Sequence, residues 1–112
     1  MGFKEAHTFD KRESESRRIR AKYPDRIPVI VDAPTVLGLD KFKYLVPNDL
    51  TIGQFRHVLR NRMKKLKPDE ATFLFCNNGV SASSNMMSQI YKENHDKDGF
   101  LYVKVGKEST FG

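Results

Sequence analysis

The sequence has 112 residues, with 20 Lys or Arg against 14 Asp or Glu and a formal net charge of +6. This length suits one compact domain and nearly excludes a two-domain enzyme with a catalytic cleft between its domains. Cys76 is the single cysteine, so no internal disulfide can form; with neither a secretory leader nor an apolar run of about 18 residues, we expect a cytoplasmic protein without a transmembrane segment.

The first predicted element is a highly charged helix from Phe9 to Lys22. Glu13 lies four residues before Arg17, a spacing that brings opposite charges side by side on a helix. Pro24 then ends the helix, because the residue before a proline is forced out of the helical region. The apolar stripe of this helix is thin, and we expect it to pack on a domain that begins after it.

Two short strands are predicted next, at Arg26–Val31 and Lys43–Pro47, with a loop between them. Pro28 interrupts the first run, and because proline cannot donate a hydrogen bond to a ladder, we expect part of that strand to be exposed. The second strand is short and flanked by lysines, which is typical of a protected sheet edge. Such an edge can accept a peptide as an added strand.

The clearest local signal is the start of a long helix. Thr51, followed three residues later by Gln54, predicts a capping box, and Leu50 with Phe55 predicts a hydrophobic staple around it. Apolar residues then recur at helical spacing, and we expect this core helix to continue until Pro68.

The remaining elements are shorter. Thr72–Cys76 and Phe100–Val105 predict two further strands, and a short helix capped by Ser83 or Ser84 is predicted between them. Four strands crossed by one long helix form a single sheet of the α+β class.

Catalytic and metal sites are poorly supported. Cys76 lies inside an apolar strand, where a buried and unreactive thiol is the usual finding. His7, His57 and His95 share no ligand spacing with one another or with the cysteine. The sequence contains no phosphate-binding loop and no nucleophile elbow. We therefore expect no enzyme activity, no metal site and no cofactor.

Positive charge is concentrated in the middle of the chain, where residues 41–67 hold eight basic residues and one acidic residue. Such a block favours an acidic peptide, an anionic lipid headgroup or nucleic acid. Phe42 and Tyr44 lie among these charges, but no helix-turn-helix, RNP or KH signature accompanies them. We expect a solvated basic face that meets peptides or lipid, and a small nucleic-acid- or cytoskeleton-binding protein is the alternative.

Several motifs agree in order and spacing with one known family. They are Phe9-Asp10-Lys11-Arg12, Arg26-Ile27-Pro28-Val29-Ile30, Lys43-Tyr44-Leu45-Val46-Pro47, Asp49-Leu50-Thr51, Gly53-Gln54-Phe55, Asp98-Gly99-Phe100-Leu101-Tyr102 and Thr110-Phe111-Gly112. From about Phe3 onward the chain resembles the ubiquitin-like autophagy modifiers, the GABARAP and autophagy-related protein 8 family. The resemblance implies a ubiquitin-like β-grasp fold, with a four-stranded mixed sheet, a long crossing helix and two additional N-terminal helices.

The resemblance also implies a domain plan and a function. Residues 1–24 would form a helical extension, residues 25–106 the β-grasp domain and residues 107–112 a flexible conjugation tail. Activating and conjugating enzymes would join Gly112 to phosphatidylethanolamine, and a cysteine protease would process or release the chain. The protein would then pass from the cytoplasm to the autophagosome membrane and recruit cargo receptors that carry an aromatic-x-x-aliphatic motif. A peptide-binding adaptor that is never conjugated is the alternative.

Two peptide-binding pockets follow from the resemblance. The aromatic pocket would be lined by Glu15, Ile19, Pro28, Ile30, Lys43, Leu45 and Phe100. The aliphatic pocket would be lined by Tyr44, Val46, Pro47, Leu50, Phe55 and Val58, with Arg62 near its rim. From the residues alone, Ile30, Leu45 and Phe100 are explained equally well as plain core residues.

The chain departs from the family pattern at a few positions. Its loop at Ala33–Asp40 is shorter than usual, Phe42 stands where a lysine is common, and Ser81-Ala82-Ser83 replaces a proline-rich turn. These departures concern the choice of partner rather than the fold.

Overall fold

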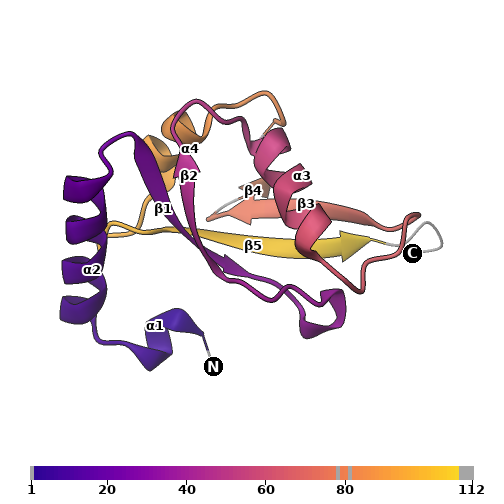
Figure 1. The fold of residues 1–112 in the computed structure, drawn as a ribbon, viewed down its shortest axis with the longest axis horizontal. Coiled ribbons are helices and arrows are strands. Elements are labelled where there is room, and N and C mark those ends of the chain that lie inside the picture. Colours follow the sequence, from indigo (N-terminus) through magenta and orange to yellow (C-terminus); the bar gives the residue numbers. More distant parts are fainter. Residues whose placement is uncertain (1, 78, 81, 109–112) are drawn as a thin grey trace.

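A mixed sheet forms the centre of the molecule. The structure is a computed structural model and describes residues 2–77, 79–80 and 82–108. The strands have the spatial order β2-β1-β5-β3-β4. Their bounds are β1 Arg26–Asp32, β2 Lys43–Pro47, β3 Ala71–Cys76, β4 Gly79–Val80 and β5 Leu101–Glu108. β1 and β5 are parallel, and the other neighbours are antiparallel. The four predicted strands are confirmed, and the two-residue β4 adds a fifth (Figure 1).

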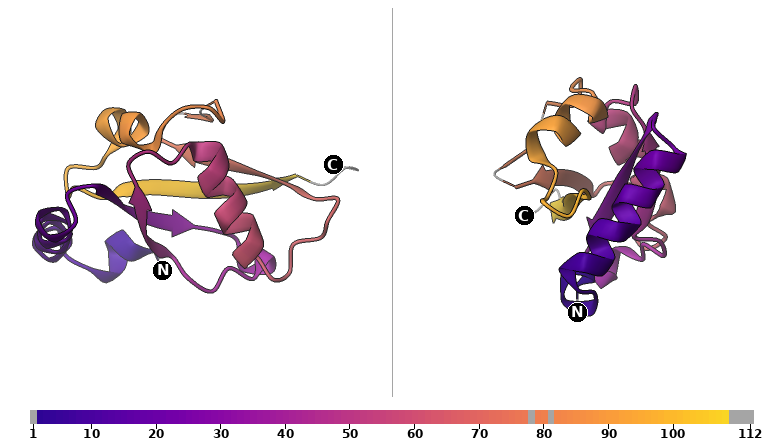
Figure 2. Two further views of the ribbon diagram at one scale, coloured as in Figure 1. Left: turned by 45° about the horizontal axis from the view of Figure 1, so that its top comes forward. Right: turned by 90° about the vertical axis from the view of Figure 1, so that its left-hand side faces the viewer.

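The helices are α1 Phe3–Ala6, α2 Phe9–Lys22, α3 Ile52–Arg62 and α4 Met87–Asn94, with a 3-10 turn, η1, at Thr35–Leu37. α2 has the predicted bounds, and the Thr8 hydroxyl caps it by accepting from the Lys11 N–H. α1 and α2 lie at the end of the molecule where β5 begins, and α3 lies across the sheet (Figures 1 and 2).

The main core lies between the sheet and the helices α3 and α4. Phe55 and Leu59 of α3 and Met87 of α4 are buried there against side chains from β1 that include Val29 and Val31. The side chains that alternate with these in β1 belong to the other face of the sheet. Phe3 of α1 packs its ring on that face at 5.3 Å from the ring of Phe100.

The predicted capping box of α3 is confirmed. The Thr51 hydroxyl accepts from the Gln54 N–H at 3.1 Å, and the Gln54 side-chain oxygen accepts from the Thr51 N–H at 2.9 Å. The prediction that α3 continues to Pro68 is wrong, because the helix ends at Arg62. The next residue, Met63, leaves the helical conformation with φ −88° and ψ 87° and forms an isolated β-bridge with Leu39.

Pro28 and the cap of α4 also differ from expectation. Pro28 is fully buried in a strand with neighbours on both sides rather than exposed. It lies one residue before Val29, where the pairing with β5 begins, so its missing N–H falls at the margin of that ladder. α4 begins after Met86 without a side-chain cap. Ser83 instead accepts from the Gly53 N–H through its backbone carbonyl.

β5 is longer than predicted. It continues through Lys107 and Glu108, which pair with Thr72 and Ala71 of β3. The Lys107 ammonium also pairs with the Glu70 carboxylate at 2.7 Å. Lys107 and Glu108 therefore belong to the sheet rather than to the predicted tail at 107–112. Gly112 lies outside the described residues. Within the part of the chain that is described, no helix is long and apolar enough to cross a membrane.

Candidate functional site

β2 forms one edge of the sheet, as the sequence predicts. The Val31 N–H donates to the Phe42 carbonyl, and the Asn48 N–H donates to the Asp25 carbonyl. Bonded pairs alternate along an antiparallel ladder, so Tyr44 and Val46 also turn their backbone groups toward β1. The backbone N–H and C=O groups of Lys43 and Leu45 therefore point outward, where an added strand could meet them.

The same alternation separates the side chains of β2. Tyr44 and Val46 point into the core below α3 and are 9% and 3% exposed. Lys43 and Leu45 point to the opposite face, where they are half-buried. A peptide added to this edge would therefore lie between two different surfaces, one on the side of α2 and one on the side of α3.

Strand register and one ion pair bring together six of the seven residues predicted for the aromatic pocket, and the seventh, Ile19, lies on α2 one turn after Glu15. Strand register aligns Leu45 with Pro28 and Lys43 with Ile30, and Phe100 lies directly before the first β5 residue that pairs with β1. α2 contributes the other two, Glu15 and Ile19, which are one turn apart. We call this set the aromatic surface.

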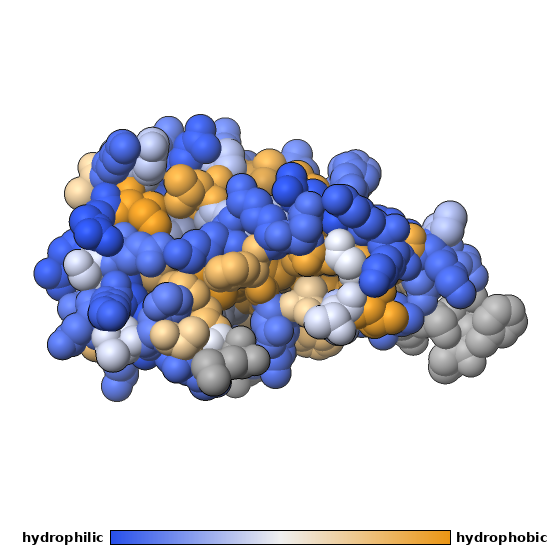
Figure 3. All heavy atoms as spheres, turned by 60° about the horizontal axis from the view of Figure 1, so that its bottom comes forward, coloured by the Kyte–Doolittle hydropathy of each residue, from blue (hydrophilic) through white to orange (hydrophobic). Residues whose placement is uncertain are grey.

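Three of the residues that form the floor of the aromatic surface are buried. Pro28, Ile30 and Phe100 are each at most 4% exposed, so the accessible members are Glu15, Ile19, Lys43 and Leu45. An ion pair of 2.7 Å between the Lys43 ammonium and the Glu15 carboxylate crosses from β2 to α2 over this floor. Viewed from the side of α1 and η1, apolar surface lies in the middle of the molecule between hydrophilic borders (Figure 3).

The residues predicted for the aliphatic pocket divide into two groups. Tyr44, Val46 and Phe55 are core residues, with the rings of Tyr44 and Phe55 packed edge to face at 5.6 Å. Burial raises the pKa of the Tyr44 phenol, whose O–H donates to the Lys41 carbonyl.

The second group reaches the surface. It consists of Pro47, Leu50, Val58 and Arg62, and Val58 is 42% exposed. Arg62 pairs with Asp40 at 3.3 Å. We call Leu50 and Val58 the aliphatic surface, because they line one hollow. Pro47 is exposed at the end of β2 and alternates onto the face of Lys43 and Leu45.

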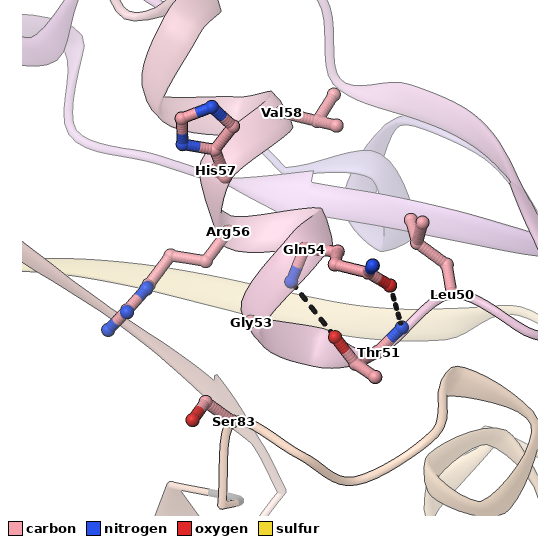
Figure 4. Close-up of a pocket in the computed structure, with 8 residues that line it drawn as sticks. All are labelled: Leu50, Thr51, Gly53, Gln54, Arg56, His57, Val58 and Ser83. Atoms are coloured by element: carbon pink, nitrogen blue, oxygen red, sulfur yellow. Dashed lines mark hydrogen bonds between the residues drawn. The ribbon is translucent and has the colours of Figure 1, made fainter.

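A shallow hollow lies beside the first turns of α3 (Figure 4). It contains Leu50 and Val58 of the aliphatic surface, together with six residues that the sequence did not indicate for any site: Thr51, Gly53, Gln54, Arg56, His57 and Ser83. A Cβ atom on Gly53 would lie 2.9 Å from the Ser83 carbonyl oxygen. A glycine in the first turn of a helix is a signal for such a close backbone approach.

Asp98 holds α2 against the sheet, and the sequence did not indicate this role. Its fully buried carboxylate accepts from the Arg12 guanidinium at 2.5 Å and from the Tyr102 hydroxyl at 2.5 Å, and also from the Phe100 N–H. Burial and this carboxylate raise the pKa of Tyr102. The cluster fixes the helix that carries Glu15 and Ile19, and so positions one wall of the aromatic surface.

The metal-ligand and cysteine positions can be examined in the part of the chain that is described. Those residues include no cluster of three His, Cys, Asp or Glu side chains that could hold a metal ion. Cys76 is buried, and burial raises the pKa of its thiol to about 11. At neutral pH the thiol is therefore protonated, whereas nucleophilic attack needs the thiolate.

The sheet with its crossing helix defines a ubiquitin-like protein, and comparisons with known proteins agree. A family model described as "Autophagy protein Atg8 ubiquitin like" matches residues 11–112. Autophagy-related protein 8 of Mycosarcoma maydis is 53% identical over 113 residues, covering 98% of this chain and 95% of that protein. Autophagy-related protein 8A of Oryza sativa subsp. indica is 52% identical, with coverage of 98% and 94%.

Solved structures show the same relationship. The crystal structure of Trypanosoma brucei ATG8 superposes with a TM-score of 0.86 at 42% sequence identity, covering 100% of this chain and 98% of that one. This chain belongs to the Atg8 family of ubiquitin-like autophagy proteins. Family membership implies, at a coarse level, conjugation machinery of the ubiquitin type and cargo receptors as partners. The resemblance read from the sequence and the fold it implied are thereby confirmed.

Proposed function

We propose that this protein is a modifier that is joined through Gly112 to phosphatidylethanolamine and recruits receptors bearing an aromatic-x-x-aliphatic motif to autophagosome membranes. Family membership supports the first half of this function. The second half depends on one observation: among the described residues β2 is an outer strand of the sheet, and it has an apolar surface on either side.

The spacing of the motif suits this edge. Residues three positions apart in an extended strand point to opposite faces, because side chains alternate with a period of two. An aromatic side chain directed to the aromatic surface would therefore place the aliphatic one on the side of α3, near Leu50 and Val58. Outward backbone groups of Lys43 and Leu45 would supply the hydrogen bonds that hold the peptide.

The two surfaces also specify a direction. Leu45 and Lys43 of the aromatic surface lie within β2, whereas Pro47 ends the strand and Leu50 follows it. A peptide whose aromatic residue comes first and whose aliphatic residue comes later would run parallel to β2.

Conjugation would change the location of the protein without changing its fold. Glycine has no Cβ atom to obstruct a narrow enzyme cleft or an attacking amine, which suits Gly112 as an acyl donor. Two lipid chains contribute about 0.8 kcal/mol for each buried methylene, enough for stable anchoring. In this proposal the chain is the substrate of activating and conjugating enzymes and of a cysteine protease, and is not itself an enzyme. It would begin in the cytoplasm and end on the autophagosome membrane.

Calorimetric titration with three peptides tests the binding half of the proposal. One peptide carries the full motif, one has its aromatic residue replaced by Ala, and one has its aliphatic residue replaced by Ala. We expect micromolar binding of the first and at least about tenfold weaker binding of the other two, equivalent to about 1.4 kcal/mol each. Equal binding of all three would contradict the assignment of two surfaces.

A further inference from the structure

Two phenylalanines extend the apolar face beyond the aromatic surface. Phe42, directly before β2, is 51% exposed, although its carbonyl is fixed to β1 by the Val31 N–H at 2.8 Å. The ring of Phe3 in α1 lies 6.2 Å from the ring of Phe42 and 5.3 Å from that of Phe100. The Lys43 ammonium lies 5.2 Å from the centre of the Phe3 ring. Phe3 therefore connects the floor of the aromatic surface to the exposed ring of Phe42.

The position of this pair along the strand edge is defined by the order of the residues. Phe42 precedes Lys43 and Leu45, and the aliphatic surface lies beyond the other end of β2. In a peptide parallel to β2, residues that come before the aromatic one would therefore lie toward Phe42. Side chains two positions apart share a face and are separated by about 6.6 Å along a strand.

We propose that Phe3 and Phe42 form a third subsite, which takes an apolar side chain two positions before the aromatic residue of a bound peptide. This inference rests on the proposed peptide-binding function and makes it more specific. The occupant is one residue of the added strand, because that residue must point to the same face as the aromatic one. The residue between them points to the opposite face and does not contact the subsite.

The subsite is accessible to a peptide side chain, and its two rings are held in fixed positions. Phe42 offers half of its surface to solvent, and its backbone is held in place by β1. Phe3 is supported from below by Phe100 and from the side by His7, whose ring lies 4.8 Å away. An apolar side chain placed between these rings would bury area that is now partly wet, which favours binding.

A pair of peptides tests this proposal. They share the aromatic-x-x-aliphatic motif and differ only two positions before the aromatic residue, where one has Leu and the other Ser. Calorimetry with the wild-type chain should show the Leu peptide binding about three- to tenfold more tightly. Phe42→Lys should remove that difference, because it lowers the affinity of the Leu peptide toward that of the Ser peptide.

Two further variants make the result specific. Phe3→Ala should also remove the preference for Leu, with circular dichroism and thermal unfolding to show that the fold is retained. Val36→Lys adds the same charge at an exposed apolar residue of η1, outside the subsite, and should keep the preference.

Other outcomes overturn the inference. Equal affinities of the two peptides for the wild-type chain would exclude the subsite. Tighter binding of both peptides to Phe3→Ala would mean that Phe3 covers the aromatic surface rather than extending it. Failure of both peptides to bind any variant would contradict the proposed function itself, and the subsite would fall with it.

Discussion

The Lys43 ammonium donates to the Glu15 carboxylate at 2.7 Å and so joins the edge strand β2 to the helix α2, 28 positions earlier in the chain. The pair lies over the aromatic surface, and both side chains remain partly exposed. Exposed pairs of this kind contribute about 0–1 kcal/mol to stability, because water screens their attraction. The pair can therefore open without unfolding the domain.

Glu15→Gln is expected to release Lys43 for an acidic residue of a bound peptide. A peptide with acidic residues beside its aromatic residue should then bind about two- to fivefold more tightly at low salt, mainly through a faster association rate. A peptide with neutral flanks serves as the control and should not change. Stopped-flow fluorescence at low and high salt measures both; an equal gain for the two peptides would contradict a role for the Lys43 charge.

Leu45→Ala is expected to weaken peptide binding more than folding. Leu45 is half-buried at the open edge, so its truncation should cost on the order of 1–2 kcal/mol of peptide affinity, a five- to thirtyfold loss. The matched control is Val46→Ala, the next residue of the strand, which is 3% exposed in the core. That change should cost about 2 kcal/mol of unfolding free energy.

Calorimetry and urea unfolding on both variants decide whether Leu45 serves mainly in peptide binding or in core packing. A large stability loss for Leu45→Ala, with unchanged peptide affinity in the folded fraction, would make Leu45 a plain core residue.

Asp98→Asn is expected to loosen α2. Removing one charge from a buried pair leaves the other uncompensated, and for Arg12 with Asp98 we expect a loss of about 3 kcal/mol in unfolding free energy. Asp96→Asn is the control, because Asp96 pairs with Lys4 at a more exposed place and should lose no more than about 1 kcal/mol. Urea denaturation measures both. Similar losses for the two variants would show that Asp98 has no special part in holding the helix.

Gly112→Ala tests conjugation. In a reconstituted reaction with activating and conjugating enzymes and liposomes containing phosphatidylethanolamine, the parent chain should gain the mass of the lipid and sediment with the liposomes. The Ala variant should do neither and should retain the circular dichroism spectrum and melting temperature of the parent. Sedimentation of the variant with liposomes would contradict attachment through Gly112. Absence of conjugation in the parent chain would favour the adaptor that is never conjugated.

Local signals in the sequence were sufficient for several elements. Thr51 and Gln54 predicted the start of α3 correctly, because a capping box depends only on residues within one turn. The short strand Lys43–Pro47 was correctly predicted as a sheet edge. The features that were predicted wrongly depend on contacts between residues far apart in the sequence. α3 ends early because Met63 bridges to Leu39, and Pro28 is buried because β5 arrives from the far end of the chain.

The candidate site was predictable in outline only. The residues of both surfaces came from the resemblance to a family, whereas the open edge strand between them was predicted from local signals. Burial then divided them, since Phe55 and Phe100 are each 1% exposed whereas Val58 is 42% exposed. Asp98 gave no signal, because a buried acidic residue is recognisable only once Arg12 and Tyr102 are seen beside it.

The open edge of β2 matters for these molecules when many of them share one surface. Unpaired strand edges from identical copies can join to each other, and crowding favours such self-association. Lys41, and Lys43 when its pair with Glu15 opens, place positive charge on this edge in every copy, so two copies repel one another at the place where they would otherwise pair. An acidic peptide experiences the opposite force. Charge at this edge therefore selects a different partner over a second copy, and a dense layer of these proteins would remain a set of separate binding sites.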